Sequence, residues 1–168
     1  MADSIDVFIE IPQGSRNKYE YDHESHAIRL DRVLHSSVHY PSDYGFIPNT
    51  LSEDGDPLDV LVLVYEPTFP GCIVPARPIG VLRMDDDKGY DEKILAVPAG
   101  DPRFDDIFDL VNLHEHWLRE IENFFATYKL LEEKDTELHG WKDAESARQV
   151  IAQACERYEQ TLQIESPH

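Results

Sequence analysis

The sequence predicts an α+β fold, in which two main helices in the C-terminal third pack on a small β-barrel. Short apolar or alternating stretches, separated by turn residues, fill the first two thirds of the chain. Apolar residues then recur at helical spacing over most of the remainder. Because 168 residues are enough for one sizeable core, we expect residues 1–168 to form a single domain.

The expected strands are short apolar runs or stretches of period-two alternation, bounded by turn residues. They lie at residues 5–11, 18–22, 26–34, 60–64, 73–74, 79–82 and 94–98. Residues 35–49 are rich in Tyr, Pro, Ser and Gly, and we expect them to form a long ordered connection. A connection of this length inside a compact domain is often functional.

The two expected helices follow from apolar residues spaced three and four apart. Asn112 is expected to cap the first, whose apolar positions run from Leu113 to Leu131. The second is expected to begin near Asp143 and to continue at least to Tyr158.

Composition excludes several classes of protein. Lys and Arg total 15 against 34 Asp and Glu, and a formal charge of −19 disfavours binding to nucleic acid. The longest apolar run, residues 60–65, is too short to cross a bilayer, and no signal peptide is visible after Met1. Cys72 and Cys155 lack CxxC or zinc spacing, so a reduced, cytoplasmic chain is the simplest expectation.

The most informative stretch carries Asp54, Asp56 and Asp59 directly before the apolar run 60–64. Gly55 and Pro57 restrict the backbone between the acids and favour a turn there. Three carboxylates so close together remain ionised only with positive charge between them. Oxygen ligands suit a hard divalent cation, Mg²⁺ before Ca²⁺.

A second acidic stretch, residues 84–93, lies between two expected strands. Alone it would more often be an exposed hairpin tip, but the first acidic loop in the same small domain favours a shared metal site. Four cations, Lys18, Arg32, Lys93 and Lys129, lie in or beside the stretches that carry the acids or the candidate tyrosines. Metals together with basic side chains indicate a multiply charged anion, and phosphates fit best.

At these positions the chain resembles the family I soluble inorganic pyrophosphatases of the small, Mg²⁺-dependent bacterial type. Residues 54–59 are similar to that family's D-x-D-P-x-D signature. The match continues in order over nearly the whole chain, through residues 10–12, 18–20, 31–32, 40–41, 43–46, 77–80, 86–93, 124–125 and 128–129. The resemblance implies hydrolysis of pyrophosphate, bound as its metal complex, to two phosphates.

The resemblance also implies which residues hold metal. Asp54, Asp59 and Asp91 would hold the high-affinity ion, and Asp59 would also reach a second one. Asp86 with Asp91 would hold an ion that arrives with the substrate. Glu10 and Glu20 would bind a further ion, largely through water. Several Mg²⁺ ions per site are implied, with Mn²⁺ or Zn²⁺ as possible substitutes.

Other implied roles concern the reaction and the assembly. Asp56 is the first choice as general base for the attacking water, with Asp91 as the alternative. Six residues would contact phosphate oxygens: Lys18, Arg32, Tyr44, Lys93, Tyr128 and Lys129. The resemblance further implies a five-stranded barrel of the OB type and a homohexamer.

Some residues keep two interpretations. His23 either tunes metal preference or pH response near the site, or is an ordinary surface histidine. Asp86 matches the family by its spacing to Asp91, yet Asp87 could also contribute. Two other functions compete: a cation-binding module, which leaves the four cations unexplained, and an oligonucleotide-binding barrel, which the charge of −19 disfavours.

Overall fold

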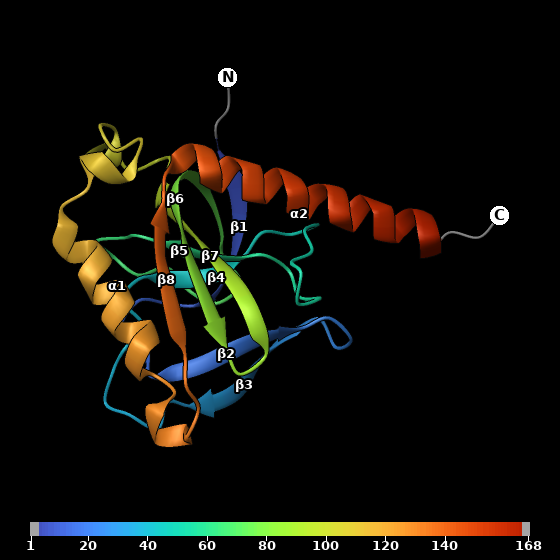
Figure 1. Ribbon diagram of the computed structural model, residues 1–168, viewed down its shortest axis with the longest axis horizontal. Helices are drawn as coiled ribbons and strands as arrows, with labels where there is room; N and C mark the ends of the chain where they lie inside the picture. Colours follow the sequence, from blue (N-terminus) through green and yellow to red (C-terminus); the bar gives the residue numbers. More distant parts are fainter. Residues whose placement is uncertain (1–3, 166–168) are drawn as a thin grey trace.

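The computed structural model describes residues 4–165, and its centre is a closed ring of strands (Figure 1). Around the ring the strands are β1 (Ile5–Ile11), β4 (Asp43–Phe46), β5 (Asp59–Val62), β7 (Gly89–Pro98) and β6 (Ile73–Asp86). A pairing between β6 and β1 closes it. All these pairings are antiparallel except that of β5 with β7. The expected α+β fold with a five-stranded, OB-like barrel is confirmed.

Two strands form a separate hairpin beside the barrel. β2 (Asn17–Asp22) and β3 (Ala27–Val33) pair only with each other and extend beneath the barrel in the view of Figure 1. The backbone N–H of Tyr21 donates to the Glu10 carboxylate of β1 at 2.8 Å, which ties the hairpin to the ring. The site residues carried by the hairpin therefore depend on a few side-chain contacts for their position.

The helices pack on different groups of core residues. α1 (Glu115–Thr127) buries Ile121, Phe124 and Phe125 in a cluster that includes Leu61 of β5. α2 (Ala144–Glu165) buries residues such as Val150 in a second cluster, which takes the neighbouring residues of β5. Successive side chains of a strand point to opposite faces, so β5 is covered on both sides. This explains why residues 60–64 read as an unbroken apolar run.

The structure corrects four expectations about element boundaries. Residues 35–49 are not all connection, because they contain the fully buried strand β4. The two strands expected at 73–74 and 79–82 are parts of the single strand β6. A strand that the sequence did not predict, β8 (Glu137–Lys142), pairs with β6 outside the ring.

The fourth correction concerns the start and end of α1. Its cap is His114, whose Nδ1 accepts from the His116 N–H at 3.1 Å. Asn112 instead ends the 3₁₀ turn η2 (Leu110–Asn112), where its side chain takes part in a capping box. α1 ends at Thr127, and the apolar pattern beyond it belongs to another 3₁₀ turn, η3 (Leu130–Glu132). Between residues 4 and 165, no helix has the length and apolar character needed to span a membrane.

Candidate active site

An open cavity lies where the hairpin, the barrel and the end of α1 meet. Its lining includes seven carboxylates and four lysines. The residues expected to be functional that line it are Glu10, Lys18, Glu20, Tyr44, Asp54, Asp56, Asp59, Asp86, Asp91, Lys93, Tyr128 and Lys129. Thus the structure brings together every predicted site residue except Arg32.

The first acidic loop is a tight turn before β5. The Asp56 N–H donates to Asp54 Oδ1 at 3.0 Å, and Gly55 adopts a positive φ of 92°. An L side chain is strained in that conformation, which accounts for the glycine. The loop is anchored behind by Thr50, whose hydroxyl accepts from the Leu58 N–H at 3.0 Å. The three carboxylates are therefore presented from one short, restrained segment.

Lys93 occupies the centre of the barrel side of the cavity. Its Nζ lies 2.7 Å from Asp59 Oδ2, 2.7 Å from Asp91 Oδ2 and 2.7 Å from the Tyr44 hydroxyl. The parallel pairing of β5 with β7 sets Asp59 opposite Lys93, which explains how residues 34 positions apart meet. One ammonium thus holds two like-charged groups together.

Burial and neighbouring charges shift the protonation of these groups. Burial opposes the charge on Lys93, but attraction to Asp59, Tyr44 and Asp91 holds its pKa well above the usual value. Burial raises the pKa of Asp91 to about 6, against the attraction of Lys93. Burial likewise raises the pKa of Glu10 to about 7, although the Tyr21 N–H favours its ionised form. Burial is thus the main reason that the pKa values of both acids are raised.

Tyr44 and Tyr128 enter the cavity from well-packed positions. Tyr44 lies on β4 beside Gly45, where any Cβ would clash with the backbone of Phe8 on β1. Tyr128 is the C-cap of α1, and its ring stacks on Phe124 with centroids 5.1 Å apart. Burial raises the pKa of both phenols. Both hydroxyls therefore remain protonated and able to donate at neutral and mildly alkaline pH.

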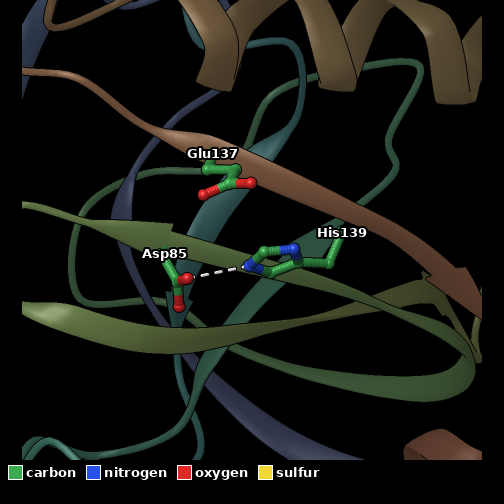
Figure 2. Close-up of side chains that lie close together, drawn as sticks. All are labelled: Asp85, Glu137 and His139. Atoms are coloured by element: carbon green, nitrogen blue, oxygen red, sulfur yellow. Dashed lines mark hydrogen bonds and ion pairs between the residues drawn. The ribbon is translucent and has the colours of Figure 1, made fainter.

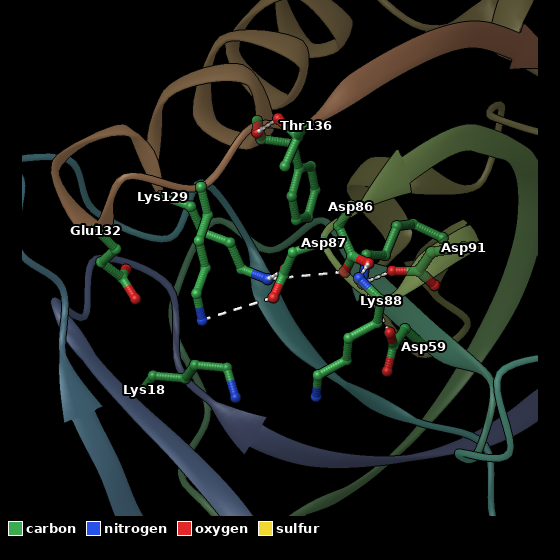
Figure 3. A network of polar contacts seen from close by, with 12 residues as sticks. Lys18, Asp59, Asp86, Asp87, Lys88, Asp91, Lys129, Glu132 and Thr136 are labelled. Carbon is green, nitrogen blue, oxygen red and sulfur yellow. Dashed lines mark hydrogen bonds and ion pairs between the residues drawn. The ribbon is translucent and has the colours of Figure 1, made fainter.

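The second acidic stretch divides its carboxylates among different partners (Figure 3). Asp86 lines the cavity, with Lys129 Nζ 3.7 Å away. Asp87 does not line it and instead bridges Lys129 at 3.0 Å and Lys134 at 3.5 Å. The structure therefore places Asp86 as the spacing predicted and gives Asp87 a lysine-pairing role.

Arg32 is held behind the cavity rather than in its lining. Its Nη1 donates to Asp31 Oδ2 at 2.7 Å, and its Nε lies 2.8 Å from Glu132 Oε1. Lys18, directly opposite on β2, lines the cavity and shares the Asp31 carboxylate at 3.2 Å. Arg32 is thus the cross-strand neighbour of a lining residue, Lys18, and does not itself line the cavity.

Comparison with known proteins identifies the family. A family model described as inorganic pyrophosphatase matches residues 7–159. The inorganic pyrophosphatase of Methanosarcina mazei is 58% identical over 152 residues, which cover 90% of each chain. That of Synechocystis is 54% identical over 157 residues, covering 94% of this chain and 93% of its own. The solved inorganic pyrophosphatase of Thermus thermophilus superposes with a TM-score of 0.91 at 46% identity, covering 94% and 92% of the two chains.

The chain belongs to the inorganic pyrophosphatase family. This confirms the resemblance inferred from the sequence and, with it, the prediction of a hydrolase.

The cavity of this pyrophosphatase family member also contains Tyr21, Phe46 and Lys88, to which the sequence assigned no role in the site. His23, for which the sequence left two interpretations, lines the cavity and packs edge-on against Tyr21 at 4.7 Å between centroids. Tyr21 lies next to Glu20 on β2, where strict alternation predicts opposite faces. Both side chains nevertheless line the cavity.

A separate acidic cluster lies outside the cavity, on β6 and β8 (Figure 2). Asp85 pairs with Glu137 in register, and His139 Nε2 lies 2.8 Å from Asp85 Oδ2. One possible ligand atom from each of the three lies within 4.8 Å of the others. The hydrogen bond between the imidazole and Asp85 accounts for this closeness on a partly exposed face.

The carboxylates of the cavity themselves fit divalent metal. Among residues 4–165, Glu10, Glu20, Asp54 and Asp56 form no ion pair with any Lys, Arg or His. Four carboxylates without a cation, gathered around one opening with three more, form an all-oxygen donor set of high negative charge. Hard cations such as Mg²⁺ favour such donors.

Proposed function

We propose that the chain hydrolyses inorganic pyrophosphate to two orthophosphates with the help of several Mg²⁺ ions held in this cavity. The observation that carries the proposal is the meeting of seven carboxylates with Lys18, Lys93 and Lys129 in one cavity. Carboxylates suit metal, and lysines suit phosphate oxygens. The cavity offers about 190 Å³. Because each water-sized group needs roughly 10–15 Å³, this volume is large enough for a small polyatomic anion together with several metal ions.

The proposed metal ligands are the acids on separate segments around the opening. Asp54, Asp59 and Asp91 would hold the first ion, and Asp59 would share a second. Asp86 with Asp91 would hold an ion that enters with pyrophosphate, and Glu10 with Glu20 a further one. Bound Mg²⁺, or Mn²⁺ or Zn²⁺ in its place, would activate a water for attack and neutralise phosphoryl charge.

Asp56 is the proposed general base. Its carboxylate lines the cavity and has no ion pair among the described residues, so its lone pairs are available to accept a proton. Asp91 is held 2.7 Å from Lys93, which engages one of its oxygens. The pKa of Asp91, raised by burial to about 6, would also suit a base near neutral pH. We therefore keep Asp91 as the alternative that mutation must exclude.

Lysine and tyrosine groups would bind the phosphates. Lys18 on the hairpin and Lys129 after α1 both line the cavity, and Lys93 lies between Asp59 and Asp91. The buried phenols of Tyr44 and Tyr128 remain protonated and would donate to phosphate oxygens without adding charge. These donors would stabilise charge on the transferred and leaving phosphates.

Phosphate release tests the proposal directly. The purified chain is assayed with pyrophosphate, ATP and p-nitrophenyl phosphate, each with Mg²⁺ and with EDTA. We expect rapid release from pyrophosphate only, and only with metal. Asp59→Asn should lower the rate by roughly 10³-fold or more, because it removes a shared ligand.

The matched control is Asp85→Asn, which removes a nearby acid outside the cavity and should retain activity. Circular dichroism of both variants shows whether the fold is kept. If no divalent metal supports release from pyrophosphate, a cation-binding module becomes the better explanation. Near-normal turnover of a folded Asp59→Asn variant would contradict the assignment of the site.

We further propose that the chain assembles as a homohexamer in the cytoplasm. Large apolar side chains such as Phe69 and Val111 are exposed in the single chain, and association would bury such groups. Cys72 and Cys155 are both free, as expected in a reducing compartment. Sedimentation equilibrium should give six times the chain mass, and a monomer or dimer would contradict the hexamer. Cell fractionation tests the location.

A further inference from the structure

We propose that Glu132 is a positioning residue for substrate binding, which holds the Arg32 guanidinium behind the cavity lining, next to Lys18. The inference rests on the proposed hydrolysis of pyrophosphate, because Arg32 needs a phosphate to bind. Glu132 ends η3, three residues after Lys129, whereas Arg32 lies on β3 of the hairpin. The two residues are 100 positions apart and lie on the hairpin and on the turn after α1.

The ion pair between them is close and poorly hydrated. Arg32 Nε lies 2.8 Å from Glu132 Oε1, and the Glu132 side chain is only 7% exposed. Within residues 4–165, Arg32 is the one cation within ion-pair distance of this carboxylate. A carboxylate so buried is costly unless a charge partner compensates it. Glu132 is therefore committed to Arg32.

The ion pair between Arg32 and Glu132 lacks the two parallel hydrogen bonds of a bidentate pair. Arg32 Nε and Glu132 Oε2 are both buried, and neither has a hydrogen-bond partner in the described part of the chain. The Nε–H is close to the carboxylate without being aligned with it. The contact is therefore an ion pair rather than an aligned hydrogen bond, and charge attraction holds the guanidinium in place.

The other two nitrogens of Arg32 differ in whether they have a partner. Nη1 donates to Asp31, which also accepts from Lys18 at 3.2 Å. Among residues 4–165, Nη2 makes no hydrogen bond or ion pair. Because the guanidinium is planar and rigid, fixing Nε and Nη1 also fixes the direction of Nη2. Lys18, the cross-strand neighbour of Arg32, already lines the cavity.

Glu132 also links two parts of the binding surface. Its backbone N–H donates to the Lys129 carbonyl at 3.0 Å, so one turn carries both Lys129 and the partner of Arg32. Among residues 4–165 the hairpin has no strand pairing with the barrel, and the Arg32–Glu132 ion pair ties its second strand to η3. Loss of Glu132 should therefore misplace Arg32 without touching the acids of the barrel wall.

A double-mutant cycle tests this role. Glu132→Gln keeps the shape of the side chain and removes its charge. We expect KM for Mg²⁺–pyrophosphate to rise roughly tenfold, as for loss of one charged hydrogen bond, with a smaller fall in kcat. In an Arg32→Ala background, the same change should alter KM by less than about twofold. Glu133→Gln is the matched control, since the neighbouring side chain is exposed, and it should leave KM unchanged.

Thermal unfolding shows whether each variant keeps its fold. Kinetics then separates positioning from general stability, because a purely structural Glu132 would lower activity equally in both backgrounds. Equal loss in the two backgrounds, or an unchanged KM in Glu132→Gln, would overturn the inference while the wild type still hydrolyses pyrophosphate. If the wild type releases no phosphate, the proposed function fails first and this inference fails with it. If Arg32→Ala alone unfolds, Arg32→Met replaces it in the cycle and keeps the bulk of the stem.

Discussion

The two walls of the cavity hold similar side chains in different environments. The barrel wall, Tyr44, Asp59, Asp91 and Lys93, lies on three paired strands, and its lysine is 5% exposed. The hairpin wall, Lys18 and Glu20 on β2, stands on an isolated two-stranded sheet, and its lysine is 23% exposed. Lys93 contacts three polar groups at 2.7 Å, whereas Lys18 contacts one carboxylate at 3.2 Å.

The difference indicates on which wall the removal of one charged side chain should lower stability more. Charges removed from water attract each other strongly, but each also loses hydration, so removing one partner leaves the other uncompensated. Charges that keep their water contribute about 0–1 kcal/mol when they pair. The barrel wall should therefore be rigid and intolerant of mutation, and the hairpin wall adjustable.

Lysine deletion on each wall should give the largest contrast. Lys93→Ala leaves Asp59 and Asp91 as neighbouring acids without their ammonium, and we expect a loss of about 3–5 kcal/mol in the free energy of unfolding. Lys18→Ala should cost less than about 1 kcal/mol, because its ion pair is partly exposed. Urea unfolding in EDTA measures both, and equal losses would remove the distinction between the walls.

Mutation of the base should act on the rate and leave stability nearly unchanged. Asp56→Asn removes an acid with no ion pair in the described chain, so we expect kcat to fall by roughly 10²-fold or more. KM should change little, because phosphate contacts remain. A kcat close to that of the wild type would transfer the role of base to Asp91.

Much of the fold was predictable because its signals are local. The apolar run at residues 60–64 predicted a buried strand, and β5 lies there. β8 was missed because Glu137–Lys142 combines charges with Gly140, and its strand character comes from pairing with β6. β4 was missed because a four-residue strand is hidden among turn-forming residues.

The boundary of α1 shows a different limit. Asn112 and His114 are both able to cap a helix, and the choice depends on η2, whose capping box uses the Asn112 side chain. The apolar residues after Thr127 continue the helical spacing although the helix has ended. Competition between adjacent turns of this kind is not visible in periodicity.

The site was predictable where residues follow a family motif and unpredictable where partners are distant. Asp86 could be separated from Asp85 and Asp87 only by spacing, and the structure shows the physical reason. Asp85 turns to His139 on β8, and Asp87 turns to Lys129, which leaves Asp86 facing the cavity. The pairing of Arg32 with Glu132 has no local signal at all.

Burial of Glu10 on the barrel side should also make stability depend on pH. Burial raises the pKa of Glu10 to about 7, above its usual value of 4.5. The folded state thus prefers the protonated carboxyl. Its contribution to stability is complete below about pH 4.5 and is lost as pH rises through about 7, a change of about 3 kcal/mol.

Unfolding of the metal-free protein between pH 4 and 8 measures this loss, and Glu10→Gln should flatten the slope. Glu24→Gln, which removes an exposed acid from the turn of the hairpin, is the control and should keep the wild-type slope. Added Mg²⁺ binds the ionised carboxylates and should raise stability most at high pH. An unchanged slope in Glu10→Gln would show that another group is responsible.

The smallest effect is expected at Asp87, whose carboxylate would compete with a substrate phosphate for Lys129. The Lys129 hydrogen bond and its charge lower the pKa of Asp87, so the carboxylate is ionised at neutral pH and engages the lysine at 3.0 Å. Asp87→Asn removes that charge and leaves Lys129 freer for phosphate. Since the pair is partly exposed, KM for Mg²⁺–pyrophosphate should fall by about two- to fivefold.

The measurement is KM at saturating Mg²⁺, with Asp85→Asn as the control. If Asp87→Asn instead raises the Mg²⁺ concentration needed for half-maximal rate, Asp87 is a metal ligand, and the separation of Asp86 from Asp87 is wrong.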